Sequence, residues 1–412
     1  MSSNAGADSF GARVRLARRA KSLDRAALGA LVGWPESTVT DVELDRLALE
    51  RHSAIVRLAD ALEVDVVWLS GQPYPPGEPF QNAGHSVVPA LRTALRRTGL
   101  ILSGHSGMHA ATAPQPLPAL RTDVDELVRH RQAADLRQVM LVLPDLLEHL
   151  NTRALDSAGT ADLAVVHRLI IGVHQVARMA LNKLGYHDLA WTAVENAAAA
   201  AARSGDPLMR ACAAWDRCGV LLHTGSLAQV ITVAETAMDD LHGRLHTPNP
   251  QALSLYGALT LRCAVAASRR NDAPAAWQYL DEAELIAARL GPGRNDFQTV
   301  FGPGNVAIHA TELAVELDQP ESALRWHDGI DLATVPSKER HTRHRIDLAR
   351  AYGQLGRDAA AVGALREALG DTPHYVSHHP LARALVENLL HRAHPTALAA
   401  GLTGLAQTMG LR

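Results

Sequence analysis

The sequence predicts an all-α protein in two parts. Apolar residues recur three and four positions apart through much of the chain, as on one face of a helix. Aromatic residues make up only 4% of the chain although hydrophobic residues reach 47%, which favours close-packed helices filled by Ala, Leu and Val over sheets. A proline-rich stretch divides a short first part from a long second part. We expect a disordered N-terminus (1–9), a first helical domain (10–71), a linker (72–87) and a second helical region (88–412).

The first part is predicted to hold five short helices. Asp24 stands where an N-cap belongs, before the second helix, and Gly33 suits the positive φ that ends it. The third helix is expected to start after Pro35 and to run through Leu44. Apolar residues at helical spacing then mark the faces that pack together. They are Phe10, Val14, Ala17, Ala27, Leu28, Leu31, Val39, Val42, Ile55, Leu58, Ala59, Leu62, Val67 and Leu69.

The second and third of these helices have the spacing of a helix-turn-helix. A helix, a short turn containing Gly33, and a short helix with small polar residues outward is the geometry that fits the DNA major groove. Short hydroxyl side chains let the helix approach the base edges, and arginines on the first two helices are suited to phosphates. The residues expected to contact DNA are Arg15, Arg18, Arg25, Ser37, Thr38, Thr40 and Asp41.

The same segment resembles a known family. The resemblance is carried by Phe10-Gly11, Val14-Arg15, Arg18, Asp24-Arg25, Leu28, Gly33, Ser37-Thr38-Val39-Thr40, Val42-Glu43 and Leu58-Ala59 with Leu62. These look like the Cro/C1-type (XRE) helix-turn-helix family, and residues 69–74 are similar to the segment that follows this domain in actinobacterial regulators with a tetratricopeptide-like C-terminal region. The resemblance implies a transcriptional regulator that binds a double-stranded operator. By position, Arg25 takes the place of a phosphate-binding Gln.

Three acidic residues depart from the family pattern. Glu36 and Asp41 stand where many relatives have basic residues, and Asp45 replaces a common Gly. Between residues 10 and 70, nine Lys and Arg face nine Asp and Glu, so this part has no net positive charge. Because the release of counterions from phosphates supplies much of the affinity for DNA, we expect weak non-specific binding. A helix-turn-helix that has lost DNA binding, within a protein-interaction scaffold, is the alternative.

The second part repeats a helix start. A helix is expected over 88–97 and a mobile loop over 98–118. Beyond the loop, a turn residue is followed five positions later by a small residue in five places. These pairs are Gly185/Ala190, Gly225/Val230, Asn271/Ala276, Asp318/Ala323 and Gly356/Ala361. The pattern predicts an α-solenoid of helix pairs similar to tetratricopeptide repeats, with a less regular helical bundle as the alternative.

Stacked helix pairs curl into a superhelix with a concave face, where a ligand can be held. Amides there suit a peptide backbone, an arginine suits a carboxylate, and a tryptophan suits an apolar group. The residues expected to line this face are Gln175, Asn182, Trp215, Asn305, Glu312 and Arg350. The alternative is that each bonds to a neighbouring helix, or, for Asn305 after Gly-Pro-Gly, that it caps one.

Other chemistry has little support in the sequence. His341 and His344 lie one turn apart, but no acid or cysteine nearby gives metal-ligand spacing, and no catalytic or nucleotide-binding motif is present. We therefore expect no metal, no cofactor and no enzyme activity. The sequence shows no membrane span or signal-peptide core, so a cytoplasmic protein is expected. We also expect a homodimer that reads two half-sites about 34 Å apart and responds to a peptide or small-molecule effector.

Overall fold

The computed structural model describes residues 9–73, 84–105, 113–245, 249–392 and 397–411, all in helices, turns and irregular segments without a β-strand. The all-α prediction is confirmed for this part of the chain. Most of the expected disordered N-terminus and most of the proline-rich linker lie outside the described residues. None of the described helices is both long enough and apolar enough to cross a membrane.

The first domain has the five predicted helices. They are α1 (Phe10–Ala20), α2 (Arg25–Val32), α3 (Glu36–Glu43), α4 (His52–Leu62) and α5 (Val66–Ser70). The Asp24 side chain accepts a hydrogen bond from the amide of Ala27 and so caps α2. Gly33 ends α2 with a φ of 72°, as its position predicted. Val14, Leu28, Leu58 and Leu69 are fully buried in the core between these helices, whereas Leu31 faces solvent.

The second region begins with a helix longer than expected and is helical through the rest of its described length. Its elements are α7 (Val88–Leu102), α8 (Leu117–Gln132), α9 (Leu136–Asp156), α10 (Asp162–Leu184), α11 (His187–Ser204), α12 (Pro207–Thr224), α13 (Leu227–His242), α14 (Pro250–Arg269), α15 (Ala273–Leu290), η1 (Asp296–Gln298), α16 (Pro303–Glu316), α17 (Pro320–Asp328), η2 (Leu332–Thr334), α18 (Lys338–Gln354), α19 (Asp358–Asp371), α20 (Pro373–Ser377) and, last, α21 (Pro380–Arg392) and α22 (Ala397–Thr408).

The predicted loop over 98–118 was too long at both ends. Helix α7 continues to Leu102, because Thr98 and Leu102 extend its buried face and the Thr98 hydroxyl donates to the carbonyl of Ala94 within the helix. At the other end, α8 already begins at Leu117. Residues 106–112 of this loop lie outside the described residues.

The predicted helix starts are in the right places. In all five pairs the turn residue has a positive φ, between 60° and 82°, and the second helix begins two residues later. The small residue five positions after the turn is fully buried in each pair. Each turn therefore reverses the chain sharply, and the small side chain lets the second helix pack closely on the first.

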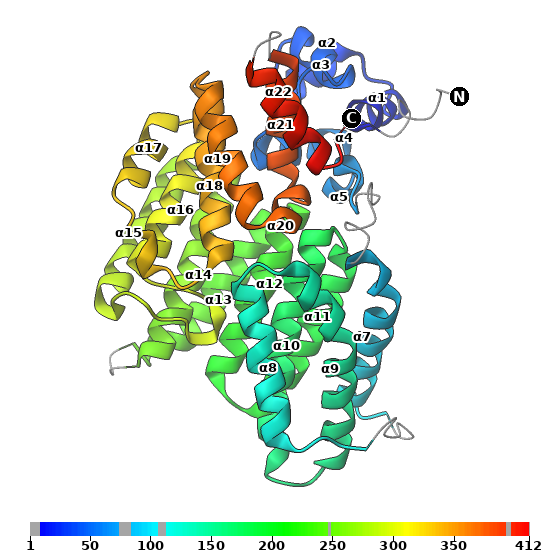
Figure 1. Cartoon of the computed structure of the whole chain (residues 1–412), viewed down its shortest axis with the longest axis vertical. Helices are drawn as coiled ribbons and strands as arrows, with labels where there is room; N and C mark the ends of the chain where they lie inside the picture. The colour runs from blue at the N-terminus through cyan, green and yellow to red at the C-terminus, as the bar shows by residue number, and fades with distance from the viewer. Residues whose placement is uncertain (1–8, 74–83, 106–112, 246–248, 393–396, 412) are drawn as a thin grey trace.

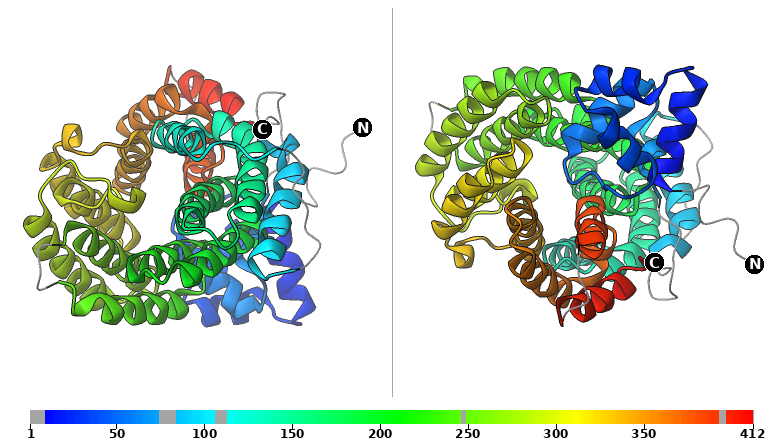
Figure 2. Two further views of the ribbon diagram at one scale, coloured as in Figure 1. Left: turned by 90° about the horizontal axis from the view of Figure 1, so that it is seen from below. Right: turned by 90° about the horizontal axis from the view of Figure 1, so that it is seen from above.

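The helix pairs follow one another around a ring. The first helices of the pairs, α10, α12, α14, α16 and α18, each pack on the next, so the array curves, and Figure 2 shows the resulting ring seen from both ends. The short α20 and the pair α21 and α22 complete the array at the end where helices α1 to α5 also lie (Figure 1). This region is called the array below.

Candidate DNA-binding interface

Helix α3 presents a polar face to solvent. Its apolar residues Val39 and Val42 are buried against the rest of the domain, while Ser37 is exposed and Thr38 is partly exposed on the opposite side. The Thr40 hydroxyl donates to the carbonyl of Glu36, 3.0 Å away, so its oxygen can still accept a hydrogen bond. This is the arrangement that the sequence predicted for a helix that contacts base edges.

Charge on this face is mixed. Asp41 is partly exposed, and its carboxylate lies 3.9 Å from the guanidinium of Arg46 just beyond the helix. Glu36 is exposed in the first turn. If α3 entered a DNA groove, both carboxylates would lie near phosphates and would oppose binding. A nearby basic side chain, or a hydrogen-bond donor on a DNA base, would offset this repulsion.

A buried carboxylate ties three helices of the domain together. Glu43, at the end of α3, accepts hydrogen bonds from Arg18 (2.5 and 3.0 Å) and from Arg25 (2.8 Å). Burial acts to raise the pKa of Glu43, but the hydrogen bonds from Arg18 and Arg25 outweigh it, so the pKa lies below its ordinary value. Arg18 also donates to the carbonyl of Leu23, 2.7 Å away.

The prediction that Arg18 contacts DNA therefore does not fit the structure. Its guanidinium is buried and committed to Glu43, so its role is to hold α1 against α3. Arg25 is partly exposed, and its Nε is used by the same carboxylate. Arg15 is also partly exposed, on α1, and unlike Arg18 and Arg25 it is not bonded to Glu43.

Asp45 explains one departure from the family pattern. It has a φ of 54°, in the left-handed region that favours glycine, and its carboxylate accepts a hydrogen bond from the amide of Gly11 (2.8 Å). A Cβ on Gly11 would lie 2.3 Å from the carbonyl oxygen of Val42, so this position needs glycine. The two residues together fix the start of α1 against the end of α3.

The first domain is docked on the array, contrary to the expectation that the linker separates them. The contact holds the segment from Ala48 to Ser53, which precedes α4 and includes its first two residues. Arg350 on α18 donates to the carbonyl of Glu50 at 3.0 and 2.7 Å, and Asn388 on α21 bonds to both the amide and the carbonyl of Ala48 at 2.8 Å. The amide of Ser53 donates to Glu316 on α16 at 2.6 Å.

Arg350 was expected to hold a ligand, and the structure places it in this docking contact. It is fully buried, and besides Glu50 it bonds to Asp347 (2.7 Å) and Glu316 (3.1 Å). Glu312, also a predicted ligand residue, pairs with Arg269 (3.3 Å) and Arg343. Both residues therefore have partners inside the protein, as the alternative interpretation held.

The other four predicted ligand residues are buried along the inner helices. Gln175 donates to the carbonyl of Phe297 at 2.9 Å, and Asn182 interacts with His187 at 3.1 Å. The guanidinium carbons of Arg178 and Arg262 lie over the Trp215 ring, 5.6 and 4.6 Å from its centre. Asn305 is inside α16 and does not cap it. Packing between helices accounts for most of these polar groups, and the structure does not gather the six into one open pocket.

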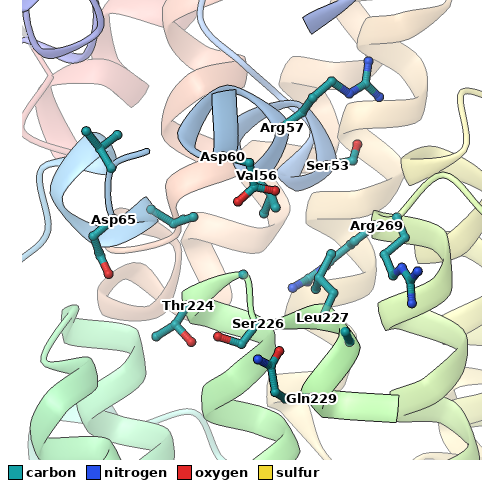
Figure 3. A pocket seen from close by; sticks show the side chains of 15 residues that line it. Ser53, Val56, Arg57, Asp60, Asp65, Thr224, Ser226, Leu227, Gln229 and Arg269 are labelled. Carbon is teal, nitrogen blue, oxygen red and sulfur yellow. The ribbon is translucent and has the colours of Figure 1, made fainter. Parts of the chain in front are cut away.

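A polar cavity of about 630 Å³ lies elsewhere, between the first domain and the array. We call it the junction cavity, and Figure 3 shows its side chains. It is lined by Ser53, Val56, Arg57, Asp60, Val64, Asp65, Val66, Thr224, Gly225, Ser226, Leu227, Ala228, Gln229, Arg269 and Arg270. No motif marks it in the sequence, because its two walls come from segments about 160 residues apart and meet only in the fold.

The comparisons with known proteins agree with the first domain. Residues 9–68 match a family model described as a helix-turn-helix domain. A comparison with curated proteins found no match for the chain. The protein thus has a helix-turn-helix domain followed by a helical C-terminal region, and the match supports a DNA-binding regulator.

Proposed function

We propose that this protein is a sequence-specific transcriptional regulator whose first domain binds a double-stranded DNA operator through α3. The observation that carries the proposal is the outward face of α3 within a matched helix-turn-helix domain, where Ser37 and Thr38 are accessible while Val39 and Val42 hold the helix in place. Arg15 on α1 and the exposed part of Arg25 at the start of α2 suit phosphates. We propose no enzyme activity and no cofactor, and a cytoplasmic location.

The array is proposed to be tetratricopeptide-like, to dimerise, and to sense a peptide or small molecule. The five consecutive helix pairs support the tetratricopeptide-like character of the array. A dimer would place two copies of α3 on neighbouring half-sites of the operator. Because the docking contact fixes the first domain on the array, a change in the array can move α3, and an effector acts by favouring one such arrangement.

A second candidate is an interaction scaffold whose helix-turn-helix no longer binds DNA. The ion pair between Arg18 and Glu43 favours the scaffold, because it removes one of the expected phosphate contacts. The acids Glu36 and Asp41 on α3 favour it as well. Under this alternative, the array binds a protein partner, and the first domain serves only as a part of that assembly.

A double variant separates the two candidates. Thr38→Arg with Asp41→Ala adds a cation and removes an anion on the outward face of α3, and we expect it to raise the affinity for duplex DNA at low salt by at least tenfold. Gel shifts on the DNA upstream of the protein's own gene provide the measurement. An affinity equal to that of the wild type would support the scaffold.

The matched control for this variant is on α8. Thr122→Arg with Asp125→Ala makes the same change of charge at the same spacing, on an exposed helix face of the array. We expect it to leave the affinity for DNA nearly unchanged. If it raised the affinity as much as the α3 variant does, net charge alone would explain the effect, and the proposal would lose its support.

A further inference from the structure

We propose that the junction cavity binds a small zwitterion, either a free amino acid or a short peptide, with its ammonium group on the first domain and its carboxylate on the array. This inference rests on the proposed function and names the ligand and the site of its sensing step. The ligand would touch both parts of the protein at the place where they meet.

The size and position of the cavity suit such a ligand. A volume of about 630 Å³ lies within the range of small-molecule sites, which is roughly 300 to 1,000 Å³. One wall comes from α4 and α5, and the other from the turn between α12 and α13 together with the end of α14. Figure 3 shows Asp60 and Asp65 on the first wall, with Ser226 and Gln229 across from them.

The wall formed by the first domain carries two carboxylates, those of Asp60 and Asp65, and one guanidinium, that of Arg57. Asp65 caps α5, since its carboxylate accepts from the amides of Val67 (2.6 Å) and Trp68 (3.2 Å). Asp60 is exposed on α4 and caps no helix, and within the described part of the chain its carboxylate makes no hydrogen bond or ion pair. Arg57 on the same wall donates to the carbonyl of Val32 in its own domain. Asp60 is therefore the group available to an ammonium.

The wall formed by the array is basic. Arg269 donates to the carbonyl of Leu222 (2.8 Å) and forms an ion pair with Glu312 (3.3 Å), so its charge is compensated within the array. Arg270 next to it is exposed, and the described residues offer it no acidic partner. The first turn of α13 lies on this wall too, and its N-cap Ser226 makes no side-chain capping bond. The guanidinium of Arg270 and the backbone amides in the first turn of α13 can bind a carboxylate.

Because the two facing walls carry opposite charges, they disfavour both a simple anion and a simple cation. A simple anion would meet the two carboxylates of Asp60 and Asp65 against the single cation Arg57, and a simple cation would meet Arg270, so each is opposed by one wall. A zwitterion that spans the cavity meets a favourable partner at both ends. Ser53 also lines the cavity, and its amide makes the docking bond to Glu316, so a bound ligand would stabilise one placement of the first domain.

Calorimetric titration of the full chain tests the inference with defined probes. The probes are the proteinogenic amino acids and trialanine with free ends, together with N-acetyl-trialanine and trialanine amide. We expect saturable binding of at least one probe with both ends free, and at least tenfold weaker binding when either end is blocked. Failure of every probe to bind at millimolar concentration would overturn the inference, as would equal binding of the blocked forms.

Variants assign the site. Asp60→Asn is expected to weaken the free-ended probe about tenfold, the loss of one charge-assisted hydrogen bond, and to leave the N-acetylated probe unaffected. Arg270→Ala is expected to weaken the free-ended probe while sparing the amide. Asp125→Asn and Arg121→Ala on α8 are the matched controls and should bind like the wild type. Unchanged binding by Asp60→Asn would overturn the assignment.

The failure of this inference can be told from a failure of the proposed function. Gel shifts on the same protein samples report DNA binding without any probe. If DNA binds and no zwitterion does, the junction cavity is not the sensing site, and the regulator stands. If no duplex binds, the proposed function fails, whatever the probes show.

Discussion

At the scale of single residues, Glu43 decides how the first domain is held together. The helical pattern places Arg18 in the first helix and Glu43 in the third. It cannot show that their side chains form an ion pair, because the two residues are 25 positions apart and belong to different helices. The sequence therefore suggested a phosphate contact for Arg18, and the structure shows a buried ion pair. The capping role of Asp24 was predictable because it depends on neighbours only three residues away.

Replacing Glu43 by Gln should destabilise the first domain. Arg18 would stay buried without its counter-charge, so we expect the free energy of unfolding to fall by about 3 kcal/mol. Hydrogen exchange of the α1 and α3 amides, measured on the full chain, reports this change. Glu63→Gln is the control, since its exposed carboxylate pairs with Lys21 at the surface and should change exchange little. Exchange in Glu43→Gln equal to that of the wild type would refute the role of Glu43.

The same carboxylate predicts a pH dependence. The pKa of Glu43 in the folded protein lies below its ordinary value of 4.5, so the unfolded chain binds the proton more readily. Its contribution to stability is therefore complete above about pH 4.5 and is lost as the pH falls through the lower folded value. We expect the difference in stability between wild type and Glu43→Gln to be constant near neutral pH and to shrink in acid. A difference that grows in acid would contradict this.

At the scale of helices, the sequence predicted the features that depend on residues close together in the chain, such as the turns between paired helices. The positive φ at Gly185 and at the four equivalent turns follows from the residue types and their spacing from the next helix. The end of α7 was missed because Thr98 is a poor marker of helix in the sequence, whereas in the fold the burial of Thr98 and Leu102 extends the helix. The docking contact was also missed, since Ala48 and Asn388 are 340 residues apart.

Asn388→Ala should loosen the docking contact without disturbing the array. The amide of Ala48 donates to the Asn388 side chain, and losing that bond should speed its hydrogen exchange about tenfold. Asn151→Ala is the control, because Asn151 is buried and bonds to the carbonyl of Ala94 within the array. If Ala48 exchanged at the same rate in Asn388→Ala and in the wild type, the segment from Ala48 to Ser53 would be held by other contacts.

At the scale of the whole molecule, a helix-turn-helix domain is joined to an array that positions it. A chain whose regions are linked only by a flexible segment would let α3 turn freely, whereas Arg350 and Glu316 hold the segment from Ala48 to Ser53. We propose that a movement of α16, α18 or α21 is passed on to α3 through this segment. The sequence could not show this, because the proline-rich stretch indicated separation and the contacts come from distant helices.

The proposed dimer can be measured directly. We expect sedimentation to give twice the mass of the chain, and a duplex with two half-sites to bind more tightly than a duplex with one, because binding of the second domain becomes intramolecular. A duplex with the half-sites moved apart by half a helical turn serves as the control and should bind like the single site. A monomer with equal affinity for all three duplexes would exclude this arrangement.

The claim on which all else depends is that the outward face of α3 reads base pairs. Selection of bound duplexes from a random pool by the full chain at low salt, followed by sequencing, tests it most directly. We predict that one motif is enriched, with two half-sites about one helical turn apart. Sequences recovered at the frequencies of the starting pool would contradict the account.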